Sequence, residues 1–389
     1  MEYKKIGELT SVVTGGTPKT SHPEYWENGE IPWLQSGCCQ NCDVYSSEKY
    51  ITKEGYDNSS TRLMPADTVM IALTGATAGK IGYLRFEACG NQSITGIFPC
   101  NSLNQRYLFY FLISQRERIL SDCIGGAQPH ISQGYVKDIK IPIPTMEEQQ
   151  SIVKRLETTR QLIDQRQNEI KLLDQLIKAR FVEMFGNPAS NNKGWDLKLI
   201  EDCLTSIDSG KSFVCDSSSR IGNKPGILKL SAVTYGVYNP NENKAMINDN
   251  DFISAAEVHD GDLLFTRKNT PELVGMAAYV ESTPKSLMMP DLIFRLNTNK
   301  NCNKIYLWKL INHELYRPMI IRAASGSAKS MSNISKERLG KIKIPLPPCD
   351  LQMKFANFVT QVDKSRFVVQ KALDEAQLLF DSLMQEYFG

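Results

Sequence analysis

Two copies of one short motif organise this chain: IKIPIP at residues 139–144 and IKIPLP at residues 342–347. The dipeptide Ile-Ser precedes each copy at the same distance, at residues 131–132 and at residues 334–335. Both elements are therefore displaced by the same 203 positions along the chain. A shared displacement of two separate motifs is the signature of an internal repeat.

The repeat continues beyond the motif in one unbroken register. The displacement of 203 residues places Gln149 on Gln352, and it still holds where MFG at residues 184–186 meets YFG at residues 387–389. A period of about 200 residues is far above the roughly 20–45 residues of a solenoid repeat. The chain is therefore a duplicated large unit. Weaker similarity joins residues 6–16 to 200–210 and residues 66–70 to 261–265.

Each copy of the motif is followed by a stretch with seven-residue periodicity. Proline excludes a helix interior within the motif itself. Beyond it, every seventh residue is apolar in the first stretch, at Leu156, Ile163, Ile170, Ile177 and Met184. Such spacing is typical of a coiled-coil seam. We expect long helices at residues 146–187 and 349–389 that pair with each other, against the alternative that each lies on its own domain.

The segments before the helices contain short β-type runs and irregular turns. We expect two globular domains of the α+β class, at residues 1–145 and 188–348, each a mixture of helices and strands. The regular strand-helix alternation of a dinucleotide-binding sheet is absent from these segments of the sequence. The expected strands are at residues 68–73, 81–85, 226–230, 262–266 and 292–296, and the expected helical stretches are at residues 105–120 and 305–322.

The charge of the chain limits its partners. The formal net charge is only +2, whereas nucleic-acid-binding proteins usually carry a basic surplus. Lys and Arg against Asp and Glu number 13 against 14 in residues 1–145 and 21 against 16 in residues 187–348. Binding to a polyanion must therefore rest on local patches, helped by a more basic partner.

The composition predicts a cytoplasmic, water-soluble protein with reduced thiols. The ten cysteines are scattered, and the first residues, MEYKK, lead into a short amphipathic stretch without the apolar region of a signal peptide. No stretch approaches the roughly 18 apolar residues that a membrane span needs. We therefore expect no membrane contact.

Motif tests for catalysis are negative. GATAGK at residues 75–80 has too few residues between its glycines for a phosphate loop, and Ile81 follows the lysine where Ser or Thr is needed. We interpret it as a tight basic turn. Cys38, Cys39 and Cys42 contain a single CxxC spacing without a second pair, which favours a buried, reduced cluster. We expect no catalytic set, no metal site and no cofactor bound by this chain.

Further short motifs are spread along the chain: TGGTP at residues 14–18, IPW at 31–33, LTGATAGK at 73–80, GGAQPHIS at 125–132 and IPIP at 141–144 followed by Glu148-Gln149. By their order and spacing, these motifs resemble those of the specificity subunits of type I restriction-modification systems, over essentially the whole chain. The second half departs from the pattern at residues 350–352, where DLQ stands in place of a Glu-Gln pair.

The resemblance implies a function in a restriction system, the bacterial defence against phage. Residues 1–145 and 188–348 would be two target-recognition domains, each binding one half of a split double-stranded DNA target. The two helices would run antiparallel as a coiled-coil spacer with pseudo-two-fold symmetry. They would also dock two modification (methyltransferase) subunits. Those subunits would bring S-adenosylmethionine and methylate adenine, and restriction (endonuclease) subunits would cleave DNA with ATP and magnesium.

Candidate DNA contacts are basic, amide and hydroxyl side chains in turns, since such groups bind phosphates and base edges. A competing interpretation is a coiled-coil scaffold whose globular ends bind proteins. In the first domain the candidates are Lys19, Thr20, Ser21, Thr74, Lys80, Gln128 and His130. In the second domain they are Lys211, Ser212, Lys229, Tyr235, Arg267, Lys268, Asn269, Lys329 and Ser330.

Overall fold

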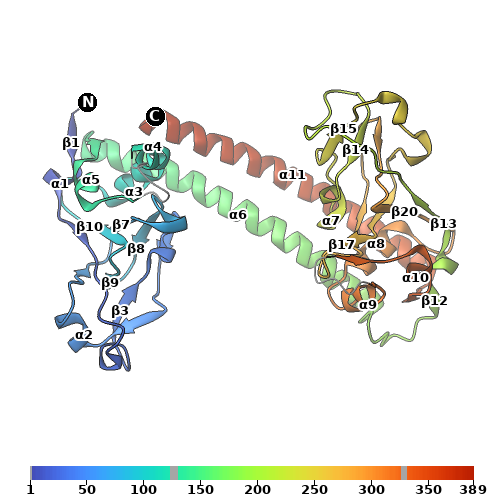
Figure 1. Cartoon of the computed structure of the whole chain (residues 1–389), viewed down its shortest axis with the longest axis horizontal. Coiled ribbons are helices and arrows are strands. Elements are labelled where there is room, and N and C mark those ends of the chain that lie inside the picture. The colour runs from blue at the N-terminus through green and yellow to red at the C-terminus, as the bar shows by residue number, and fades with distance from the viewer. Residues whose placement is uncertain (1, 123–129, 326–330) are drawn as a thin grey trace. The chain divides into compact units, whose positions relative to one another are not determined.

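The computed structural model describes residues 2–122, 130–325 and 331–389. They form two compact units: unit 1 consists of Met1–Gln167 with Lys371–Gly389, and unit 2 is Asn168–Gln370. Each unit contains one globular domain and one part of each of the two long helices, α6 and α11 (Figure 1).

The globular domain of unit 1 is built on two antiparallel-rich sheets. A five-stranded sheet has the order β2-β10-β7-β8-β4, a four-stranded sheet has the order β5-β3-β9-β6, and β1 pairs with β11. The strands are β1 (Tyr3–Lys5), β2 (Val12–Thr14), β3 (Ile31–Leu34), β4 (Cys42–Val44), β5 (Lys49–Ile51), β6 (Leu63–Met64), β7 (Val69–Ala72), β8 (Ile81–Leu84), β9 (Ala88–Gly90), β10 (Ile94–Ile97) and β11 (Lys140–Pro142).

The globular domain of unit 2 repeats this plan. Its larger sheets have the orders β13-β20-β16-β18 and β15-β14-β19, and the pairs β12-β22 and β17-β21 complete it. The strands are β12 (Leu197–Leu199), β13 (Leu204–Ser209), β14 (Gly226–Leu228), β15 (Asn243–Ala245), β16 (Leu263–Thr266), β17 (Lys268–Asn269), β18 (Ala277–Tyr279), β19 (Leu287–Met288), β20 (Ile293–Thr298), β21 (Ser332–Asn333) and β22 (Lys343–Pro345).

Short helices cover the sheets, and their first turns are capped by the chain itself. Asn104 and Asn303 precede α3 and α8, and each side chain accepts hydrogen bonds from two backbone N–H groups of the first turn. The helices of unit 1 are α1 (Ile6–Leu9), α2 (Lys53–Asp57), α3 (Gln105–Ser114), α4 (Arg116–Asp122) and α5 (Gln133–Asp138), and those of unit 2 are α7 (Ser231–Thr234), α8 (Lys304–Asn312), α9 (Arg317–Arg322) and α10 (Lys336–Gly340).

Equivalent residues of the internal repeat make equivalent hydrogen bonds. Gln149 accepts a hydrogen bond from the backbone N–H of Asn104 and donates one to the carbonyl of Pro144. Gln352 makes the same two bonds, with Asn303 and Pro347. The two halves therefore use one way of joining the proline-containing motif to the long helix.

Two helices of 40 residues each, α6 (Met146–Phe185) and α11 (Cys349–Phe388), follow the motifs. At the start of α6, Glu148 accepts a hydrogen bond from the backbone N–H of Thr145, whose hydroxyl accepts one from the N–H of Glu148. This reciprocal cap fixes the first residue of the helix directly after the motif.

The helices pair in both units, as the seven-residue spacing predicts. In unit 1 the buried Leu156 and Ile163 share a core with Phe380 and Phe388, and in unit 2 Phe181 packs edge-on against Phe355. Low-numbered residues of α6 meet high-numbered residues of α11, so the pairing is antiparallel. Of the predicted seam, Leu156, Ile163 and Ile177 are buried, whereas Ile170 and Met184 are half-buried.

These features confirm the expected fold class: two α+β domains with antiparallel long helices and an internal repeat. The turn at residues 75–80 is also as expected, with Gly75 and Gly79 at φ values of 75° and 72°, which favour glycine. One expectation is wrong: Cys42 is exposed, so the cluster with Cys38 and Cys39 is only partly buried. Among the described residues, no helix is long and apolar enough to cross a membrane.

Candidate nucleic-acid interface

Four loops of unit 1 meet where β2 and β7 end and β10 begins, at the same end of these three neighbouring strands. The loop after β2 lies against the turn between β9 and β10, because the N–H of Gly15 donates to the carbonyl of Ile94 and that of Gly16 to the carbonyl of Gly90. A Cβ atom at Gly15 would lie only 2.1 Å from the oxygen of Gly90. Glycine is therefore needed for this approach.

The remaining two loops join through Leu73, the residue after β7. Its N–H donates to the carbonyl of Ser93 (2.8 Å), and its carbonyl accepts from the N–H of Ile131 (3.0 Å). The hydroxyl of Thr74 donates to that of Ser93. We call the set of residues 15–22, 73–80, 90–93 and 130–132 loop cluster 1.

Loop cluster 1 brings together most of the residues predicted for the first domain. Lys19, Thr20, Ser21 and His130 are exposed, and Thr74 is half-buried. Lys80 is half-buried, and its ammonium donates a hydrogen bond to the side chain of Gln40 (2.6 Å). Gln128 lies outside the described residues.

Unit 2 has an equivalent set of loops, in which the close glycine approach and the two backbone bonds of Leu73 recur. A Cβ atom at Gly210 would lie 1.8 Å from the oxygen of Met289. The N–H of Arg267 donates to the carbonyl of Leu292, and its carbonyl accepts from the N–H of Ile334. We call residues 210–213, 267–275, 289–292 and 333–334 loop cluster 2.

The residues predicted for the second domain are divided by the structure. Lys211 and Ser212 are exposed in loop cluster 2, and Arg267 and Lys268 are half-buried there, with the guanidinium of Arg267 over the ring of Phe294. Lys329 and Ser330 lie outside the described residues.

Three further predictions fare differently. Asn269 is buried, and its amide donates to the hydroxyl of Thr234 (3.0 Å), so this side chain is occupied within the domain and is a poor candidate for DNA contact. Lys229 is half-buried in front of α7. Tyr235 is exposed but lines a hollow beside Asp174 of α6 and Arg366 of α11, outside loop cluster 2.

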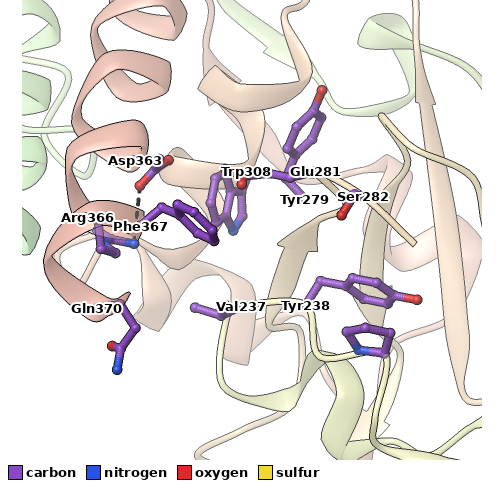
Figure 2. Close-up of a pocket in the computed structure, with 11 residues that line it drawn as sticks. Val237, Tyr238, Tyr279, Glu281, Ser282, Trp308, Asp363, Arg366, Phe367 and Gln370 are labelled. Carbon is purple, nitrogen blue, oxygen red and sulfur yellow. Dashed lines mark ion pairs between the residues drawn. The ribbon is translucent and has the colours of Figure 1, made fainter. Parts of the chain in front are cut away.

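A second hollow of unit 2 lies between β18, α8 and α11. Figure 2 shows Arg366 and Phe367 projecting from α11, with Phe367 beside Trp308 and an ion pair joining Arg366 to Asp363. Arg366 also pairs with Asp174 of α6. These contacts tie the two helices to each other within unit 2.

The hollow has a filled counterpart in unit 1. There the guanidinium of Arg106 lies 4.0 Å from the ring centre of Tyr83 and pairs with Asp43 (2.6 Å) and Glu157. Burial opposes the charge of Asp43, but the hydrogen bond and charge of Arg106 outweigh it, so the pKa of Asp43 lies below its ordinary value. The repeat places Ile305 at the position of Arg106, so unit 2 has no guanidinium there, and Ile305 packs against the hydrophobic core.

Lys309 is half-buried and lines the hollow that contains Tyr235. Its ammonium lies 3.5 Å from the ring centre of Trp308. Burial lowers the pKa of Lys309 to about 8, against the nearby charge of Asp363, which raises it. Among the described residues, no group of three or more His, Cys, Asp or Glu side chains is arranged to hold a metal ion.

Sequence reasoning missed Thr17, Gln92 and Asp291, which lie within the loop clusters. The repeat did not reveal them because its displacement is not constant. The structure matches Gly15 to Gly210, a shift of 195 where the sequence similarity of residues 6–16 to 200–210 gives 194. It matches Asn104 to Asn303, a shift of 199. Loops of unequal length separate these positions, so only the paired backbone bonds align them.

The fold and the two loop clusters define a protein with an internal duplication, in which each repeat unit carries one cluster of loops at equivalent positions. The profile of the family described as type I restriction modification DNA specificity domain matches residues 1–172 and 192–376. The chain belongs to this family, as the resemblance of its motifs predicts.

Curated relatives carry the same description. The chain is 33% identical over 162 residues to the specificity subunit of the type I restriction enzymes EcoR124I and EcoR124II of Escherichia coli, which covers 40% of each chain. It is 30% identical over 233 residues to the MjaIX specificity subunit of Methanocaldococcus jannaschii, covering 54% of this chain and 53% of that one. These matches span about half or less of the relatives' length. With the EcoKI specificity subunit of Escherichia coli strain K12, identity is 21%, over 98% of this chain and 86% of the relative.

Solved structures share the fold. The crystal structure of a type I restriction-modification S subunit from M. genitalium covers 100% of this chain at a TM-score of 0.62 and 15% identity. A structure described as the basis of complex assembly and conformational transition of the type I restriction-modification system covers 100% at a TM-score of 0.57 and 16% identity.

Proposed function

We propose that this chain is the subunit of a type I restriction-modification complex that recognises a bipartite DNA sequence. The observation that carries the proposal is the pair of loop clusters, which share the glycine approach at Gly15 and Gly210 and the backbone bonds of Leu73 and Arg267 but carry different side chains. A shared scaffold with unlike loops suits two unlike short sequences. Phosphate contacts from Lys19 and Lys211 would position the loops, and base-edge contacts would supply the specificity.

The helices support docking of modification subunits. Apolar side chains on exposed helix surfaces favour protein contact. In unit 1 these residues are Leu162, Leu378 and Leu379, and in unit 2 they are Leu172, Leu176, Val182, Met353, Phe367 and Val368. Partner subunits, two by the symmetry of the repeat, would cover them. S-adenosylmethionine would belong to those subunits, and ATP with magnesium to restriction subunits, while this chain supplies no catalytic group.

The test is sequencing that detects N6-methyladenine in the DNA of the host, with and without this gene. Loss of methylation at one split motif on deletion is the expected result. An unchanged methylation pattern, in a host where the gene is expressed, would overturn the proposal. The purified chain alone should transfer no methyl group, and activity should return when the modification subunits are added.

The scaffold interpretation makes a different prediction. A scaffold would form its protein complexes equally well without DNA and would leave methylation sites unselected. The equal construction of the two loop clusters favours the DNA-binding alternative, because protein-binding ends have no need of matched loops.

A further inference from the structure

One side-chain hydrogen bond occurs in both loop clusters at equivalent positions. The hydroxyl of Thr17 donates to Oε1 of Gln92 in unit 1, and the hydroxyl of Ser212 donates to Oδ1 of Asp291 in unit 2. The positions correspond because Ser93 and Leu292, the next residues in the chain, accept the matching backbone bonds from Leu73 and Arg267.

Close backbone contacts hold both partners of this bond in place. Gly15 and Gly210 each stand two residues before the hydroxyl, and each lies against the carbonyl of the facing turn so closely that a Cβ atom would collide. In unit 2 the N–H of Asp291 also donates to the hydroxyl of Ser212 (3.3 Å). The side chains at positions 92 and 291 are therefore held by their neighbours, as a specific contact requires.

The bond leaves different atoms to face a ligand in the two units. Gln92 is exposed, and with Oε1 bound to Thr17 it presents the two N–H donors of its amide. Asp291 is half-buried, and with Oδ1 bound to Ser212 it presents the acceptor Oδ2. One position thus offers donors in the first domain and an acceptor with negative charge in the second.

These atoms match different base edges in the major groove. Guanine presents two acceptors, N7 and O6, whereas cytosine presents the N4 amine as a donor. A carboxylate within a DNA-facing loop is repelled by phosphate, so its place there is explained by a contact to such an amine.

We propose that Gln92 and Asp291 are specificity-determining residues of the two half-targets. Gln92 selects guanine at one position of the first half, and Asp291 selects cytosine at one position of the second half. Thr17 and Ser212 are positioning residues that orient them. This inference rests on the proposed function.

The experiment uses the full chain assembled with its modification subunits and selects bound sequences from a library of random DNA duplexes. The variants Gln92→Glu and Asp291→Asn keep the size of the side chain; the first replaces the amide donors by an acceptor, and the second replaces a carboxylate acceptor by donors. Gln92→Glu should reduce the preference for guanine about tenfold at one first-half position, and Asp291→Asn should do so for cytosine at one second-half position. The other half-target is the internal control in each case and should stay unchanged.

Ser212→Ala and Thr17→Val provide a second measurement, because they leave Asp291 and Gln92 present but unoriented. They should relax selection at the same single positions, and they decide the matter if Asp291→Asn or Gln92→Glu does not fold. Unchanged half-targets in all folded variants would overturn the inference while leaving the proposed function intact. If the unaltered complex selects no split sequence, the proposed function itself fails.

Discussion

Replacing Gln149 by Met should destabilise unit 1 strongly, although the two side chains are of similar length. Gln149 is 1% exposed, and its amide joins the backbone N–H of Asn104 (2.8 Å) to the carbonyl of Pro144 (3.0 Å). Methionine fills the space but satisfies neither backbone group. Each unpaired buried group costs about 1–3 kcal/mol, so the loss of both partners should lower the free energy of unfolding by about 2–6 kcal/mol.

Urea unfolding followed by circular dichroism at the helix band measures this loss. Gln161→Met is the matched control, because Gln161 is an exposed residue of the same helix and its replacement should stay within about 0.5 kcal/mol. Gln352→Met should repeat the loss in unit 2, where the same two bonds occur. If Gln149→Met unfolds at the same urea concentration as the control, with the same slope, the amide does not stabilise the junction and our reasoning is refuted.

Three further predictions concern charge and length. If Lys80 contacts a phosphate, Lys80→Ala should weaken DNA binding by the complex for all sequences and reduce the slope of log K against log salt by about one. The control Lys371→Ala on α11 should leave this slope unchanged. An unaltered slope for Lys80→Ala would mean that Lys80 has a structural role. The depressed pKa of Lys309, about 8 against 10.5 in the unfolded chain, means that the unfolded state binds the extra proton between these values, so the stability of unit 2 should rise with pH across this window. Lys309→Met should flatten that rise and stabilise unit 2 at pH 7, and a persisting rise in thermal unfolding curves would exclude Lys309 as its source. Seven residues inserted in α6 at residues 168–178, with a matching insertion in α11, lengthen the helix pair by about 10.5 Å at 1.5 Å per residue. Methylation sequencing should then show a longer gap between two unchanged half-sequences, and altered half-sequences would contradict a pure spacer role.

The repeat, the paired helices and the fold class were predictable from the sequence alone. The copies of the motif share one displacement, and the seven-residue spacing from Leu156 onward is a local periodicity that needs no knowledge of distant contacts. Antiparallel pairing was implied by the family resemblance. Family membership could be predicted for the same reason, because its motifs lie in continuous stretches of chain.

The loop clusters were decided only by the tertiary structure. Residues 15, 90, 73 and 131 are far apart in sequence, and contacts between distant segments, including long-range backbone hydrogen bonds, bring their loops together. For this reason Lys19, Thr20 and Thr74 could be chosen by residue type, while Gln92 and Asp291 were missed.

The burial of individual loop residues could not be predicted from residue type either. By its residue type, Asn269 was expected to bind DNA, yet it is buried. By its residue type, Cys42 was expected in the core, yet it is exposed. Periodicity states which face of a helix is apolar, but a loop residue has no period, and its exposure depends on which distant segment packs over it. The sequence therefore determined the architecture of this protein, and the tertiary contacts determined which side chains its loops present.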